Sequence, residues 1–507
     1  PGVVDIELSA TNDVPGLLTV RDNVVETDPS VNYASGFRVF VNGGVSASAT
    51  GNEVGGYSRV ESSGTGALAV DDNIIIGRRA SMRVGIYSNG DEGGLVDAKT
   101  STISGNEVRS TDSSGGMTVR VRSDNERDSV ATVSNNIVSN QQAYSSGLRV
   151  YANKGSSDSD VIANVIGNQV DGRLRLRADG TAAASDGELE INVRDNLVGS
   201  DRSSAIDLDA NPRENDLTVT ITGNSVTSNS AGIDVFVDQD NDPATTNVEV
   251  SKNLALGGGS GSAISVRNRD GGVGTVFNAT VRNNIALRSG SGIAAYGNGI
   301  RIRTDSFANG TGQIDVVHNT IQGEFVSGSV YVNGSNAPNA VINVIDNVIA
   351  NEVASAIETT LVTNPPTYNQ DNNLIRSGEG GMSDVEADAQ FVNPIERFAL
   401  LVVSDPFNSE VEIIDGALSE GDRVVLAGDM MVYTVSAVVG PTAVLEGAPL
   451  PAGSDTAVAF VWSEANFVSA VPDYALEAGS PGSGAATDTG DIGALGGSDP
   501  YTPPTLP

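Results

Sequence analysis

One short motif occurs thirteen times in the chain, and it constrains the fold more than any other feature of the sequence. A β-branched residue and two variable residues lead to an asparagine, which an apolar pair follows, as in VRDNVV or VSNNIV. Successive copies lie about 21 to 35 residues apart, a period typical of solenoid proteins. The marking asparagines are Asn23, Asn52, Asn73, Asn106, Asn136, Asn168, Asn196, Asn224, Asn253, Asn284, Asn319, Asn347 and Asn373.

Two further segments in each repeat alternate apolar and polar residues. One begins at a small residue, as in GFRVFV at Gly36, and the other leads into the asparagine, as in ELEINV at Glu188. A period of two is typical of β-strands. Three short strands per repeat predict an all-β chain, a right-handed parallel β-helix of about 12–13 rungs that stack about 4.8 Å apart.

The asparagines should lie at turns that tolerate left-handed backbone geometry and should hydrogen-bond along the rod, while the flanking apolar residues stack inward. Leucine-rich repeats and propellers fit less well, because the first need a denser leucine pattern and the second aromatic blades of roughly 40 residues.

Charge and cysteine content limit the functional classes. The formal net charge is −35, so the field of the molecule opposes nucleic acid, anionic lipid and polyanionic glycans unless a local basic patch intervenes. The chain has no cysteine, which excludes disulfides and cysteine-zinc sites. No apolar run approaches the roughly 20 residues of a membrane span. Because Pro1 is not an initiator methionine, we expect that a signal peptide is absent from this chain through removal or trimming.

The repeat fades after Ser377, and five short apolar segments from Val411 to Trp462 predict a small antiparallel β-barrel or sandwich. We therefore expect an inserted β-domain near the C-terminus. The predicted organisation is a β-helix over 1–394, the inserted domain over 395–466, a closing segment of the β-helix over 467–499 and a Pro-rich tail over 500–507.

Two segments on either side of the predicted insertion carry a family resemblance. EADAQFVNP at Glu386–Pro394 and DYALEAGSPGSGAATDTGDIGAL at Asp473–Leu495 resemble the closing sequences of secreted bacterial β-helix proteins of the pectate-lyase-like superfamily, choice-of-anchor Q type. The asparagine repeats are similar to that group as well. The resemblance implies an extracellular or cell-surface protein, in a family that often continues into an anchoring signal.

Outward positions of the second strand suggest a ligand-binding stripe. Stacked rungs would align Arg38, Arg83, Arg149, Arg173 and Arg175, with Phe40, Arg120 and Tyr151 as neighbours. Such a stripe could bind acidic sugars or a protein partner through bidentate arginine contacts. The alternative is that these arginines only cover the sheet and balance acidic neighbours.

Farther along, the stripe changes sign at Asp207, Asp209 and Asp234, before Arg267, Arg301 and Arg303 restore it. Carboxylates on neighbouring rungs could act as acid and base in glycoside hydrolysis, with surface solvation or cation binding as the alternatives. The only histidine, His318, lies beside a repeat asparagine, where we expect a structural role.

Alternating carboxylates at Asp238, Asp240 and Asp242 suggest a calcium loop, although a solvated acidic turn would have the same pattern. Calcium is the only cofactor that the sequence suggests.

These patterns lead to two functional hypotheses. The first is a non-enzymatic extracellular or cell-surface protein with a structural or adhesive role, which self-assembles into a filament or surface layer or binds glycans. The second is a polysaccharide lyase or glycoside hydrolase that acts on the long face between Asp207 and Arg303. A β-helix is a scaffold for many activities, so the fold alone does not choose between them.

Overall fold

The computed structural model describes most of the chain. The described residues are 4–9, 15–26, 35–88, 98–110, 115–124, 127–140, 147–155, 158–181, 187–200, 203–240, 243–257, 261–288, 297–305, 307–323, 325, 328–350, 356–375, 384–386, 391–393, 397–405, 409–426, 431–447, 456–465, 473–476, 480, 483, 485–486 and 493. They form strands and turns and contain no helix.

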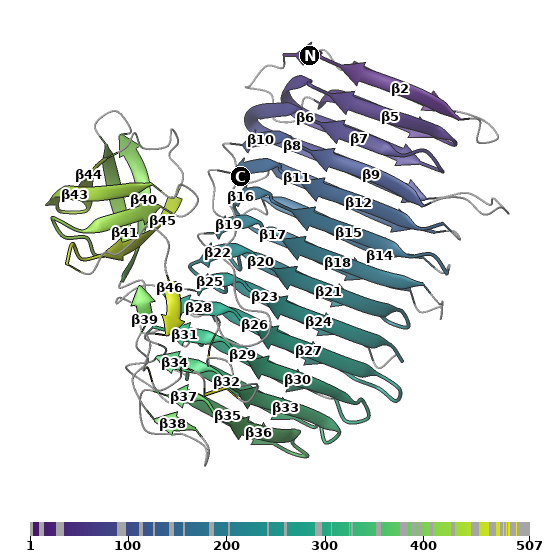
Figure 1. The fold of residues 1–507 in the computed structure, drawn as a ribbon. Coiled ribbons are helices and arrows are strands. Elements are labelled where there is room, and N and C mark those ends of the chain that lie inside the picture. Colours follow the sequence, from purple (N-terminus) through teal and green to yellow (C-terminus); the bar gives the residue numbers. More distant parts are fainter. Residues whose placement is uncertain are drawn as a thin grey trace.

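The repeats wind into a parallel β-helix with three faces (Figure 1). The long-strand face carries the alternating segments that begin at a small residue. Its strands are β1 (Val4–Ser9), β4 (Ser35–Asn42), β6 (Glu53–Ser63), β8 (Ile74–Ser88), β11 (Gly116–Ser123), β14 (Leu148–Lys154), β17 (Leu174–Asp179), β20 (Ile206–Asn211), β23 (Ile233–Asp238), β26 (Ile264–Arg269), β29 (Ile300–Asp305), β32 (Val330–Ser335) and β35 (Ile357–Val362).

The short-strand face begins directly after each repeat asparagine. β6 and β8 bend from this face into the long-strand face, so the two faces form one 25-stranded sheet. Its other strands are β3 (Val24–Val25), β10 (Glu107–Ser110), β13 (Ile137–Asn140), β16 (Gln169–Asp171), β19 (Leu197–Ser200), β22 (Ser225–Ser228), β25 (Leu254–Gly257), β28 (Ile285–Arg288), β31 (Thr320–Gln322), β34 (Val348–Ala350), β37 (Leu374–Ile375) and β38 (Val385–Glu386).

The back sheet is a separate 13-stranded parallel sheet that leads into the asparagines. It confirms the expected number of rungs. Its strands are β2 (Gly16–Arg21), β5 (Val45–Thr50), β7 (Leu68–Asp71), β9 (Lys99–Ser104), β12 (Ser129–Ser134), β15 (Val161–Ile166), β18 (Glu188–Arg194), β21 (Asp216–Thr222), β24 (Thr245–Ser251), β27 (Val276–Arg282), β30 (Gly312–Val317), β33 (Ala340–Ile345) and β36 (Thr367–Asp371).

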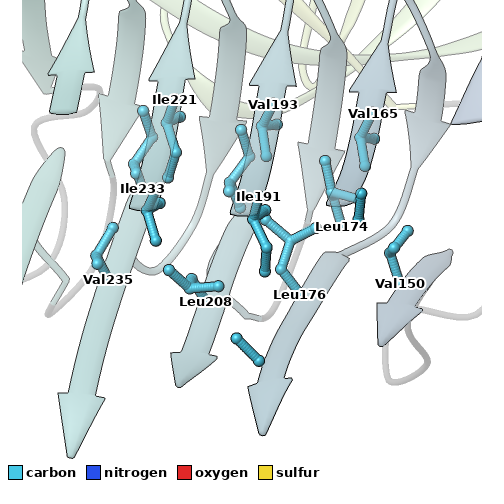
Figure 2. Packing of buried hydrophobic residues seen from close by; sticks show 14 of the residues in the cluster. Val150, Val165, Leu174, Leu176, Ile191, Val193, Leu208, Ile221, Ile233 and Val235 are labelled. Atoms are coloured by element: carbon cyan, nitrogen blue, oxygen red, sulfur yellow. The ribbon is translucent and has the colours of Figure 1, made fainter. Parts of the chain in front are cut away.

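The core consists of apolar side chains stacked in register along the rod. On the back sheet Val165, Val193 and Ile221 occupy equivalent positions of consecutive rungs, and each is fully buried (Figure 2). On the opposite side Leu176 and Leu208 stack in the same way. Burial of one such side chain stabilises the fold by about 1.5–3 kcal/mol, and every rung repeats it.

The repeat asparagines form a continuous ladder, as the sequence predicts, and it is buried from Asn52 onward. From Asn23 to Asn373, each side-chain Nδ2 donates to Oδ1 of the next asparagine at 2.8 to 3.0 Å. The backbone N–H of each asparagine donates to the same oxygen, as for Asn196 and Asn224 at 3.0 Å. After Asn373 the acceptor is a carboxylate oxygen of Asp384 at 3.1 Å. A carboxylate can end the ladder because it only has to accept a hydrogen bond, since no further asparagine follows that would need a donor.

The left-handed residue of each turn is the one before the asparagine, which corrects the expected position. Asp195, for example, has φ of 57°, and glycine has this role at Gly223, with φ of 68°. The shift explains why Gly, Asp and Asn are common at this position, since they tolerate positive φ. His318 also occupies it, with φ of 54°, and its Nε2 lies 3.9 Å from the carboxylate of Asp346, the equivalent residue of the next rung. His318 is thus a turn residue, as expected.

A buried lysine joins neighbouring rungs at the start of β9. Lys99 is 1% exposed, and its Nζ donates at 3.0 Å to the carbonyl oxygens of Gly64 and Tyr87 and to Oγ of Ser62. The carbonyl oxygen of Ser62 lies at 3.3 Å. Burial lowers the pKa of Lys99 to about 7, and the positive charge of Arg127 adds to this shift. The oxygens around Nζ stabilise the protonated amine and therefore oppose this decrease in pKa.

The inserted domain is a closed antiparallel barrel. The sequence predicts five of its strands and misses the first, β40, so the barrel has six. β39 (Phe391–Asn393) and β46 (Asp473–Leu476) pair on either side of it in the chain, which places the barrel as an insertion. The tail over 500–507 lies outside the described residues. The barrel strands are β40 (Arg397–Asp405), β41 (Glu410–Gly416), β42 (Arg423–Leu426), β43 (Val432–Val439), β44 (Thr442–Glu446) and β45 (Thr456–Trp462).

Candidate functional site

An arginine column runs along the outward side of the long-strand face. It occupies one register position in five of six consecutive rungs, and Thr118 of β11 fills the remaining one. Six rungs at the usual strand separation span about 24 Å. The structure thus aligns four of the predicted ligand-binding arginines. The column consists of Arg38, Arg59, Arg83, Arg149 and Arg175.

Arg59 is the member that sequence reasoning missed. A register shift between β4 and β6 places Arg59 three residues after Gly56, whereas Arg38 follows Gly36 by two. Counting from the glycine therefore assigns Arg59 to the wrong side of the strand. Arg173, which the sequence places in the stripe, precedes β17 and lies in the turn, outside the column.

A second outward column lies two residues farther along each strand. Here Arg120 of β11 and Tyr151 of β14 are register partners, and the Arg120 guanidinium lies 5.3 Å from the centroid of the Tyr151 ring. Arg149 lies on the same strand and the same side as Tyr151. Arg120, Arg149 and Tyr151 therefore form one half-exposed group, called here the arginine–tyrosine cluster.

Most arginines on this face have an acidic partner. Arg38 lies 3.6 Å from Asp5, and the buried carboxylate of Glu61 lies 2.6 Å from Arg59 and 3.6 Å from Arg83. The hydrogen bond to Glu61 raises the pKa of Arg59.

The arginine–tyrosine cluster is different. Within the described part of the chain, neither Arg120 nor Arg149 has a carboxylate partner. The Nε atoms of both are buried and lack a hydrogen-bond acceptor among the described residues. The cluster therefore combines two uncompensated guanidinium groups with an aromatic ring, an arrangement suited to an acidic sugar.

The predicted acidic residues continue the two columns. Asp207 and Asp234 are register partners in the arginine column, one rung apart, and Asp209 follows Arg177 in the second column. Burial raises the pKa of Asp207, while ion pairing with Arg173 opposes this change.

Both carboxylates of the column bind arginine. Asp207 forms an ion pair with Arg173 and lies 3.9 Å from Arg175. Asp234 accepts hydrogen bonds from Arg267 at 2.7 and 3.2 Å. The site that the sequence proposes for catalysis thus consists of adjacent, arginine-paired carboxylates.

The predicted calcium loop is only partly within the described residues. Asp238 pairs with Arg269, and Oδ2 of Asp240 accepts a hydrogen bond from Asn211 at 2.6 Å. Asp242 lies outside the described residues. No group of three potential metal-binding side chains occurs in the described ranges. Calcium binding therefore stays a prediction.

No protein-family model, curated protein or solved structure matches the chain. Nor does any part of the chain that the structure describes form a helix long and apolar enough to cross a membrane. The functional argument consequently depends on the outward face of the β-helix.

Proposed function

We propose that the protein is a non-enzymatic extracellular or cell-surface β-helix that binds acidic glycans along its long-strand face. The observation that carries this proposal is the arginine–tyrosine cluster, where Arg120 and Arg149 have no acidic partner among the described residues and flank Tyr151. A carboxylate or sulfate group can accept two parallel hydrogen bonds from a guanidinium.

The arrangement of the arginine column supports an extended ligand. Its members recur at the rung spacing of about 4.8 Å with one gap at Thr118, so a polymer lying along the rod could meet several arginines in succession. The net charge of −35 opposes the approach of an acidic polymer, so binding depends on the local positive charge of this face. Selectivity for a ligand would then depend on the spacing of its acidic groups along the rod as well as on its charge.

The proposed location rests on the closing segments. Their resemblance to secreted bacterial β-helix proteins of the choice-of-anchor Q type supports an exterior site of action, where acidic polysaccharides are common ligands. Self-assembly into a filament or layer is a further role for such a rod. Imaging of concentrated protein tests it, since ordered arrays would support assembly and isolated particles would exclude it under those conditions.

A second candidate function is cleavage of a polysaccharide at Asp207 and Asp234. They are register partners on adjacent rungs, and glycosidases use a pair of carboxylates that flank the scissile bond. The raised pKa of Asp207 would suit a general acid. Because both carboxylates already pair with arginines, the geometry favours binding over catalysis.

Incubation of the full chain with polygalacturonate, alginate and neutral dextran separates the two functions. We expect the acidic polymers to bind, dextran not to bind, and the affinity to fall with added salt, because salt screens exposed charges. No new reducing ends or unsaturated products should form. Equal binding of dextran, or no binding of either acidic polymer, would contradict the proposal. Product formation that Asp207→Asn abolishes would establish the enzyme instead.

A further inference from the structure

Among the described residues, a third arginine on the long-strand face has no acidic partner, and it lies well away from the arginine–tyrosine cluster. Arg301 of β29 lies in the same register column as Arg149, five rungs farther along. The distance along the rod is about 24 Å. The guanidinium of Arg301 lies 5.8 Å from the centroid of the Tyr331 ring on the next rung.

Charged side chains of both signs lie near Arg301. On the second column Arg267 is neutralised by Asp234, at 2.7 Å, and Arg303 by Asp305. No such carboxylate partner of Arg301 occurs among the described residues, and its buried Nε lacks a hydrogen-bond acceptor there. Burial lowers the pKa of Arg301, and the charges of Arg303 and Arg267 add to the shift. An anion placed here would compensate the charge of the Arg301 guanidinium itself.

Polar and aromatic groups lie on both sides of the guanidinium. Ser265 on β26 is the register partner of Arg301. Ser265 is only 5% exposed. Tyr331, the partner on β32, is half-buried, and its hydroxyl lies 3.2 Å from Oγ1 of Thr360. The contact with Thr360 holds the phenol group, so the ring can serve as a flat surface beside Arg301.

We propose that Arg301, Ser265 and Tyr331 form a separate site for one oxyanion group, a carboxylate or sulfate, carried on a sugar ring. The guanidinium binds the oxyanion, the serine hydroxyl donates a further hydrogen bond, and the tyrosine ring packs against the sugar. The choice of a sugar as carrier rests on the proposed function, whereas the oxyanion follows from the unbalanced charge of Arg301. The two sites together would contact one acidic glycan at two points.

Titration calorimetry of the full chain with glucuronate, sodium sulfate and glucose tests the site. Wild type should bind glucuronate and sulfate but not glucose. In the background of Arg120→Gln/Arg149→Gln, which removes the arginine–tyrosine cluster, Arg301→Gln should weaken the binding of both ligands by at least tenfold. The affinity of Arg301→Lys, which keeps the charge but loses the bidentate geometry, should lie between that of this background and that of Arg301→Gln. Tyr331→Ala should weaken glucuronate several-fold and leave sulfate unchanged. If Tyr331→Ala changes neither ligand, the sugar ring is not part of the recognition.

The matched control is Arg282→Gln, on the back sheet, where Arg282 pairs with Glu249 at 2.9 Å. It should bind like wild type, and unfolding transitions of all variants verify the fold. Unchanged affinity in Arg301→Gln would overturn the proposal, as would the absence of any oxyanion binding by wild type. Failure of polygalacturonate and alginate to bind would contradict the proposed function while leaving oxyanion binding at Arg301 intact, so the two failures are distinguishable.

Discussion

Replacement of Asn196 by alanine should lower the free energy of unfolding by about 3–5 kcal/mol, one of the largest effects of any single substitution in the chain. The Asn196 amide donates to the carbonyl oxygens of Val165 and Arg194, both at 3.0 Å, and to Oδ1 of Asn224 at 2.9 Å. Its Oδ1 accepts the backbone N–H and Nδ2 of Asn168, each at 2.9 Å. Alanine leaves all of these buried groups without that partner.

A matched control is available four residues earlier, in the strand that leads to Asn196. Asn192 faces outward from β18, and its Nδ2 bonds Asn164 at 2.9 Å and Glu190 at 2.6 Å. Because water can replace these half-exposed contacts, Asn192→Ala should cost only about 0.5–1 kcal/mol. Urea unfolding followed by circular dichroism measures both. Equal midpoints for the two variants would show that the ladder does not stabilise the rod.

Replacement of Lys99 by methionine should cost about 3 kcal/mol. Methionine fills a similar volume but donates no hydrogen bond, so it leaves the buried oxygens of Ser62, Gly64 and Tyr87 without the Nζ donor. The substitution Thr100→Met, on the exposed side of the same strand, is the control and should be nearly neutral. The urea midpoint is again the measurement, and a wild-type value for Lys99→Met would contradict the predicted role.

The same lysine should make stability depend on pH. Its pKa is lowered from 10.5 to about 7 in the folded chain, so between these values the unfolded chain binds the extra proton. Lys99 therefore contributes a stability that increases as the pH rises from about 7 to 10.5 and is constant below that window. The difference between wild type and Lys99→Met, measured across this range, isolates the contribution from other titrating groups.

The sequence predicts the fold because period-two alternation and the asparagine motif recur together. It does not predict which residue of the turn is left-handed, since Asp195 and Asn196 are both residue types that tolerate that geometry. The asparagine motif also does not predict that Asp384 ends the ladder, because Asp384 is not an asparagine. A carboxylate can replace the asparagine only in the last position, where nothing needs to be donated onward.

The sequence predicts most residues of the arginine column, but it does not predict which acidic residues pair with them. Rungs differ in length, and a bulge in one strand hides Arg59, so the register of stacked side chains follows from the structure and not from counting residues. Tyr331 was missed because its position in the column depends on that register. The partners of Asp207 could not be assigned either, since Arg173 reaches it from a turn.

The arginine–tyrosine cluster is the centre of the functional account, and the affinity of the double variant Arg120→Gln/Arg149→Gln for polygalacturonate tests it most directly. We expect at least a tenfold loss relative to wild type, about 1.4 kcal/mol or more, with an unchanged unfolding midpoint. Arg282→Gln on the back sheet should bind as wild type does. Equal affinity of the double variant and wild type would contradict the assignment of this face as the glycan-binding surface.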